Sequence, residues 1–61
     1  MRALQWRVEL PIAPRALLVN KTLASQGLAS TRDFTAVTVI RATEEIAIDE
    51  RLEAGDVVVF Q

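Results

Sequence analysis

The chain ends on four apolar residues in a row, Val57-Val58-Val59-Phe60, directly after the pair Gly55-Asp56. Glycine and aspartate favour a turn, here expected to be tight and to start a strand, and the β-branched and aromatic run favours the strand itself. Side chains alternate between the two faces of a strand, so this last strand is apolar on both faces. Both faces need cover, and this need limits what the chain can form.

A chain of 61 residues has few ways to stabilise such a sheet. Domains of this size bury only about 60% of their unfolded surface and commonly rely on disulfides, metals or oligomerisation. The chain contains no cysteine and no histidine, which excludes disulfides, thiolate metal sites and the usual zinc sites. With these excluded, oligomerisation is the remaining route to stability. The apolar fraction of 51% is too high for a disordered chain.

Residues 4–10 show the alternation of a strand with one polar face. Its apolar positions are Leu4, Trp6, Val8 and Leu10. Pro11 lacks the backbone donor that a central strand needs, so the strand is expected to end there. Residues 11–20 then predict a connector.

Residues 22–26 predict a short helix. Thr22 is a suitable N-terminal cap, and Gly27 suits the end of the helix because glycine adopts positive φ without steric cost. Asn20 also tolerates positive φ, so it is expected to turn the chain into the helix.

Two more strands are expected at residues 36–40 and 45–48, joined by a hairpin at the polar break Thr43-Glu44. Alternation places Val37 and Val39 on one face of the first of these strands. The opposite face is then also largely apolar, which predicts a central strand; it comprises Ala36, Thr38 and Ile40.

The fold class expected is α+β: a single domain over residues 1–61, with a small, mainly antiparallel sheet and one short helix in the order β-α-β-β-β. One short helix covers only one face of the sheet. The other face would leave an apolar patch, which monomers seldom expose beyond a few hundred Å². We therefore expect a symmetric homodimer.

No catalytic group is found in the sequence, so we expect no enzyme. Ser25 and Ser30 have no histidine to activate them, and no glycine-rich phosphate loop or calcium loop is present. We expect no metal site. Arg41, at the end of an apolar strand, is the candidate for binding a phosphate or carboxylate. The alternative is that Arg41 pairs with an acid such as Glu44 or Asp49.

The distribution of charge and hydropathy limits the kinds of partner that the chain is expected to bind. Residues 1–32 carry five basic side chains and one acidic one, whereas residues 33–61 carry seven acidic and two basic ones. The halves are expected to pair within the fold or across a dimer, and with a net charge of −1 we expect no nucleic-acid partner. The sequence shows neither an apolar run long enough to span a membrane nor the pattern of a signal peptide, so we expect a cytoplasmic chain without membrane insertion.

Three segments together resemble the TrkA-C family, also called the RCK C-terminal domain. They are "VELPIAPRALLVNKTLASQGL", "AVTVIRATEEI" and "RLEAGDVVVF". The family's turn of the form Gly-Lys-Thr-Leu reads here Asn20-Lys21-Thr22-Leu23, and its closing Leu-x-x-Gly-Asp turn ends at Asp56. Asn20 replaces the usual glycine, the hairpin lacks its customary glycine, and Asp49 stands where a proline is frequent.

The resemblance implies a TrkA-C-like fold and a non-enzymatic regulatory module of potassium channels, other ion transporters or transcription regulators. Such domains dimerise, and some bind a small ligand at the dimer interface, including cyclic di-adenosine monophosphate. A ligand site would then be sought at Arg41 with Ile40, Ile46 and Ile48 across the two-fold axis. The chain is expected either to stand alone or to belong to a longer protein, with a membrane ion channel or transporter as its partner.

Two other functions are considered. A β-grasp, ubiquitin-like protein has a similar final turn, but the sulfur carriers of that type need a diglycine end, and this sequence ends in Phe60-Gln61. A small dimeric, antitoxin-like protein would use its basic half to bind nucleic acid, with steep salt dependence.

Overall fold

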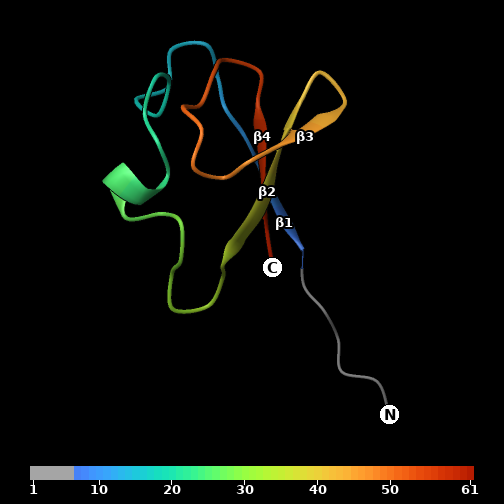
Figure 1. Cartoon of the computed structure of the whole chain (residues 1–61). Coiled ribbons are helices and arrows are strands. Elements are labelled where there is room, and N and C mark those ends of the chain that lie inside the picture. The colour runs from blue at the N-terminus through green and yellow to red at the C-terminus, as the bar shows by residue number, and fades with distance from the viewer. Residues whose placement is uncertain (1–6) are drawn as a thin grey trace.

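The computed structural model describes residues 7–61, so the positions expected at Leu4 and Trp6 lie outside the described residues. It contains four strands and one turn of 3-10 helix, in the order β1, η1, β2, β3, β4 (Figure 1). Their bounds are β1 Val8–Pro11, η1 Ala24–Gln26, β2 Ala36–Arg41, β3 Glu44–Ile46 and β4 Val57–Phe60.

The four strands form one antiparallel sheet in the order β1-β4-β2-β3. The last strand of the chain, β4, therefore lies inside the sheet, between the first strand and β2. β1 and β3 form its two edges. The antiparallel sheet expected from the sequence is confirmed, and the strand 36–40 is internal as predicted.

The expected α-helix is wrong, and the fold is mainly β. Only Ala24–Gln26 is helical, and its geometry is 3-10. The reason is the position of Gly27, whose φ of 70° ends the helix after one turn. The Leu28 N–H bonds the Leu23 carbonyl at 2.9 Å and the Gly27 N–H bonds the Ala24 carbonyl at 3.1 Å, which is the Schellman closure. One turn is too short to propagate an α-helix.

A bulge in β2 changes which of its side chains share a face. Ala36 pairs with Phe60, but the next pair along is Thr38 with Val59, so β2 advances two residues while β4 advances one. Ala36 and Val39 consequently lie on the same, buried face, whereas Val37 is 46% exposed. The expected pairing of Val37 with Val39 on one face is therefore wrong.

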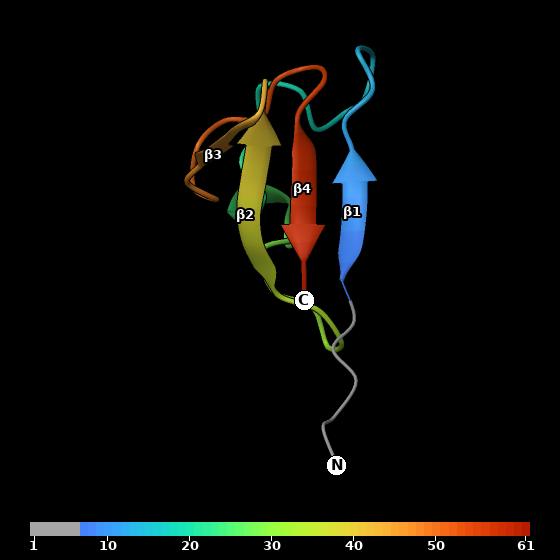
Figure 2. The ribbon, with the colours of Figure 1, turned by 90° about the vertical axis from the view of Figure 1, so that its right-hand side faces the viewer.

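One face of the sheet is covered by connectors. Figure 2 views the sheet from its other side, with β2, β4 and β1 in front and the connecting segments behind. The core between them contains apolar residues from the sheet and from the connectors. Its buried members are Ile12, Leu23, Ala36, Val39, Leu52, Val58 and Phe60.

The opposite face, here called the open face, is not crossed by any segment of residues 7–61 (Figure 2). The register assigns seven strand residues to it: Glu9 and Pro11 of β1, Val57 and Val59 of β4, Thr38 and Ile40 of β2, and Glu45 of β3. β4 is thus apolar on both faces, as the sequence predicted.

The hairpin between β2 and β3 has a two-residue loop of unfavourable composition. Ala42 has a φ of 49° and Thr43 a φ of 71°. Positive φ at both loop positions is typical of the type I′ turn, which favours Asn-Gly. β3 begins at Glu44, directly after this loop, so the strand expected at 45–48 is shifted, and Ile48 lies beyond it.

We expect the replacement of Ala42-Thr43 by Asn-Gly to raise the free energy of unfolding by about 1–2 kcal/mol, because L side chains with a Cβ are strained at positive φ. Urea denaturation measures the change. Gly55→Ala is a control in which backbone strain is added instead of removed. Gly55 has a φ of 89°, and no atom lies within 4 Å of an added Cβ, so strain alone should lower the free energy of unfolding of this variant by about 1 kcal/mol. An Asn-Gly variant no more stable than the parent would contradict the strain argument.

Candidate functional site

Arg41, the candidate anion-binding residue, is bound by a carboxylate of its own chain. Its Nε donates to Asp56 Oδ1 and its Nη2 to Asp56 Oδ2, both at 2.9 Å. This is the bidentate geometry in which a guanidinium holds a carboxylate most strongly. Nη1 also lies 3.0 Å from Glu53 Oε2. Arg41 thus pairs with Asp56 and Glu53 rather than with Glu44 or Asp49.

Asp56 is placed for this contact by the turn that precedes β4. The Asp56 N–H bonds the Glu53 carbonyl at 3.1 Å, and the Glu53 N–H bonds Asp56 Oδ2 at 2.8 Å. The positive φ of Gly55 at the third position is typical of a type II turn. The side chain of Asp56 is only 1% exposed, so it reaches inward from the turn.

Arg41 also links strand β2 to two connectors, the one between β3 and β4 and the one between β1 and η1. Arg41 Nη2 donates to the Arg51 carbonyl at 3.0 Å, and Arg51 Nη1 donates to the Asn20 carbonyl at 2.9 Å. The Asn20 N–H in turn bonds the Leu52 carbonyl at 2.8 Å. Asn20 has a φ of 68°, as expected for a turn. In this conformation its carbonyl faces Arg51 and its N–H faces Leu52.

The backbone of the same turn joins β4 to the end of β1. The Ile12 N–H bonds the Asp56 carbonyl and the Gly55 N–H bonds the Ile12 carbonyl, both at 2.8 Å. Within residues 7–61, no buried side-chain nitrogen or oxygen lacks a hydrogen-bond partner. The site is therefore a completed hydrogen-bond network around a buried carboxylate.

The ion pair shifts both pKa values in the direction that favours charge. The hydrogen bonds from Arg41 lower the pKa of the Asp56 carboxyl, assisted by the Glu53 N–H and opposed by burial. The hydrogen bond to Asp56 raises the pKa of Arg41. Both groups stay ionised in the folded protein, which leaves the pair suited to structure and not to proton transfer.

The four residues singled out for ligand binding do not converge on one place. Arg41 and Ile46 belong to the covered face, by parity along β2 and by the pairing of Val39 with Ile46. Ile40 pairs with Val57 on the open face. Ile48 lies beyond β3 and packs against the core. Three of the five N–H donors of Arg41 are used in hydrogen bonds within this chain, and Nη1 is paired with Glu53, so an anion would have to displace the protein's own carboxylates.

The open face has the composition of a contact surface. Val57, Ile40 and Thr38 are half-buried at its centre, next to the 46% exposed Val37. Val59 is only 2% exposed, since Glu9 and Thr38 flank it on the neighbouring strands. The charged members of this face, by contrast, stand on the edge strands.

The sequence pointed to Arg41 and to the Gly55-Asp56 turn separately, but not to their contact. The two segments are 15 positions apart, and six other carboxylates lie in the acidic half of the chain. An available signal was the position of Asp56 itself: an aspartate directly before a doubly apolar strand needs a partner if it is buried. Within residues 7–61, no group of three or more acidic side chains is arranged to hold a metal ion. Nor does any helical segment in this range have the length and apolar character needed to cross a membrane.

We expect Asp56→Asn to lower the free energy of unfolding by roughly 2–4 kcal/mol at neutral pH, because it leaves Arg41 without its buried partner. The parent should also lose stability as the pH falls. Its folded-state pKa at Asp56 is below the ordinary 3.8, so the unfolded chain takes up the proton first and the contribution is lost as the pH drops below about 4.

Denaturant unfolding between pH 7 and pH 2 measures both effects. The variant should show a smaller acid-dependent loss than the parent. Asp49→Asn is the matched control, since it removes one charge from an exposed side chain and should change stability by no more than about 0.5 kcal/mol. Equal acid dependence of parent and Asp56→Asn would contradict the assignment.

A scan against models of protein families, a search of curated proteins and a search of solved structures each find no match to this chain. The function is therefore inferred from the geometry above and from the sequence resemblance.

Proposed function

We propose that the chain is a non-enzymatic dimerisation module of the TrkA-C kind, whose open face packs against that of a second copy. The observation that carries this proposal is the doubly apolar β4. Its covered side chains, Val58 and Phe60, are buried by connectors of the same chain. No segment of residues 7–61 crosses the open face of β4 (Figure 2), where Val57 is half-buried and Val59 is enclosed by its neighbours on the flanking strands.

The distribution of charge on the open face supports a protein partner. Interfaces have an apolar centre from which charged residues are depleted, and a polar rim. Here Glu9 and Glu45 stand on the edge strands β1 and β3, and Glu9 is bridged to Arg7 at 3.3 Å. The centre, formed by β4 and β2, carries no charged side chain.

A second copy is the occupant we favour, because two open faces are alike and can stack as two sheets about 10 Å apart. The face is small, however. Four strands of three to six residues, about 4.8 Å apart, present roughly 300 Å². This is well below the about 800 Å² that each partner loses in a standard interface. We therefore expect a reversible dimer with a micromolar dissociation constant.

A regulatory role follows from the resemblance to TrkA-C domains, not from the geometry. In such a module, a ligand or partner that touches both subunits stabilises one dimer arrangement, and an attached ion channel or transporter responds to it. A cyclic dinucleotide at the interface is the ligand that the resemblance suggests. Arg41 is already bound by Asp56 and Glu53, so it does not favour binding of a cyclic dinucleotide at its own position. In this proposal a ligand site would instead be completed by a second subunit at the open face.

Sedimentation equilibrium over a range of micromolar concentrations tests the dimer directly. We expect the weight-average mass to rise from monomer to dimer for the parent. Val57→Glu puts a charge at the centre of the face and should raise the dissociation constant roughly 100-fold, because an unpaired buried charge costs several kcal/mol.

Leu17→Glu is the control. Leu17 is 87% exposed on a connector, so the same added charge there should leave the mass curve unchanged. Circular dichroism checks that both variants remain folded. A parent that stays monomeric throughout the concentration range, or a dimer unaffected by Val57→Glu, would refute the proposal.

A further inference from the structure

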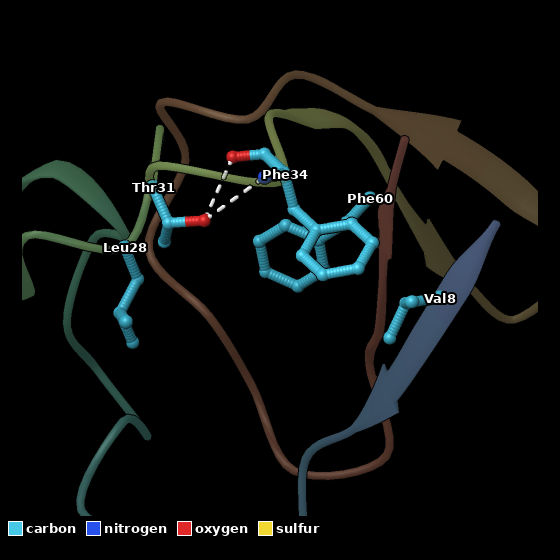
Figure 3. A pocket seen from close by; sticks show the side chains of 5 residues that line it. All are labelled: Val8, Leu28, Thr31, Phe34 and Phe60. Carbon is cyan, nitrogen blue, oxygen red and sulfur yellow. Dashed lines mark hydrogen bonds between the residues drawn. The ribbon is translucent and has the colours of Figure 1, made fainter. Parts of the chain in front are cut away.

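A small apolar pocket lies on the covered side of the sheet, at the end where β1 begins. Its volume is about 160 Å³, and it is lined by Val8, Leu28, Thr31, Phe34 and Phe60 (Figure 3). Val8 of β1 and Phe60 of β4 are paired in neighbouring strands. The other three residues belong to the connector between η1 and β2, so the pocket lies between the sheet and this connector.

Backbone hydrogen bonds hold the connector wall of the pocket in place. The Thr31 N–H bonds the Phe34 carbonyl at 2.7 Å, which makes residues 31–34 a tight turn. Directly after this turn, the Thr35 N–H bonds the Gln61 carbonyl at 2.8 Å and the Gln61 N–H bonds the Thr35 carbonyl at 3.0 Å. The wall is thus fastened to the end of β4 by bonds that need no ligand. A pocket formed in this way is largely preformed, which lowers the cost of binding.

The residues that line the pocket offer a ligand no free polar group. Thr31 is the one polar residue among them, and its hydroxyl is already used. It donates to the Phe34 carbonyl at 3.0 Å and accepts the Phe34 N–H at 3.1 Å, as the dashed lines in Figure 3 show. A phosphate or another charged group would lose its water here without gaining a partner. The lining therefore favours an uncharged, apolar group.

The volume and the two phenylalanines favour a single aromatic ring. A dry apolar cavity of about 150 Å³ is large enough to bind benzene. Phe34 and Phe60 supply two rings against which a third can stack or pack edge to face. Phe60 is only 7% exposed, whereas Val8 is 40% exposed and so lies at the rim. A ligand can therefore enter past Val8 and reach the ring of Phe60.

We propose that this pocket is a binding site for a small, uncharged molecule with one aromatic ring. A ligand of so few atoms, held by apolar contacts alone, is expected to have a dissociation constant in the millimolar range. The pocket lies on the covered side of the sheet and the open face on the other. The site is therefore separate from the proposed dimer contact and does not depend on it.

The first test is a titration of the intact chain with phenol, followed by NMR of the side-chain methyl groups. The ring of phenol should shift the methyl signals of Val8 and Leu28, and the shifts should saturate. The methyl signals of Val57 and Ile40, on the open face, should not move. Cyclohexanol is the matched ligand, because it keeps the hydroxyl and the six-membered ring but is not aromatic. It should bind roughly 2–10-fold more weakly than phenol.

The second test uses variants of the pocket. Val8→Glu places a carboxylate at the rim and should raise the dissociation constant of phenol at least about tenfold. Leu10→Glu is the matched control, since Leu10 is on the same strand and face, is 38% exposed and does not line the pocket. It should leave phenol binding unchanged. Phe34→Leu keeps an apolar side chain but removes one ring, so phenol and cyclohexanol should then bind about equally. This variant provides the test if Val8→Glu does not fold.

Four results would overturn the proposal. They are the absence of saturable shifts at Val8 and Leu28 with millimolar phenol, shifts concentrated at Val57 and Ile40, equal effects of Val8→Glu and Leu10→Glu, and equal binding of phenol and cyclohexanol by the parent. The affinity for phenol should also be the same at every protein concentration. A chain that stays monomeric would refute the proposed dimer and leave this expectation unchanged, so the two proposals fail separately.

Discussion

Strand β4 is the element on which the fold depends, because it is paired on both sides and is apolar on both faces. Its neighbours are β1 and β2, and each is antiparallel to it. Val58 and Phe60 bury themselves under the connectors and form the centre of the core. Val57 and Val59 occupy the open face. The connectors thus complete a core on one side of β4, and no segment of residues 7–61 crosses the other side (Figure 2).

The Arg41–Asp56 ion pair determines how the chain enters β4. Asp56 is the last residue before that strand, and Arg41 is the last residue of the neighbouring β2. Taking a carboxylate out of water is costly, and the pair is stable because Asp56 also accepts the Glu53 N–H. The same guanidinium donates a hydrogen bond to the Arg51 carbonyl, so one side chain binds the connector between β3 and β4 to the end of β2. This structural use accounts for the charged residue at the end of a largely apolar strand.

Much of the strand pattern followed from the sequence. The alternation before Pro11 and the apolar run 57–60 located β1 and β4, and the positions with positive φ at Asn20, Gly27 and Gly55 fall at residues that tolerate it. The errors have local physical causes. Gly27 ended the expected helix after one turn. The bulge at Val37 placed Ala36 on the same face as Val39 and not on that of Thr38. A bulge depends on the partner strand, so the alternation within β2 does not reveal it.

By itself the sequence determined that the chain forms strands with two apolar faces, because the period of two along a strand is a local property that neighbouring residues carry. It also excluded disulfides and histidine-based metal sites by composition. The order of the strands, the choice of Asp56 as the partner of Arg41 and the pocket between Phe34 and Phe60 were decided only by the tertiary structure. Each of these joins residues far apart in the chain. Several partners of the same chemical type compete for each position, and packing in three dimensions selects among them.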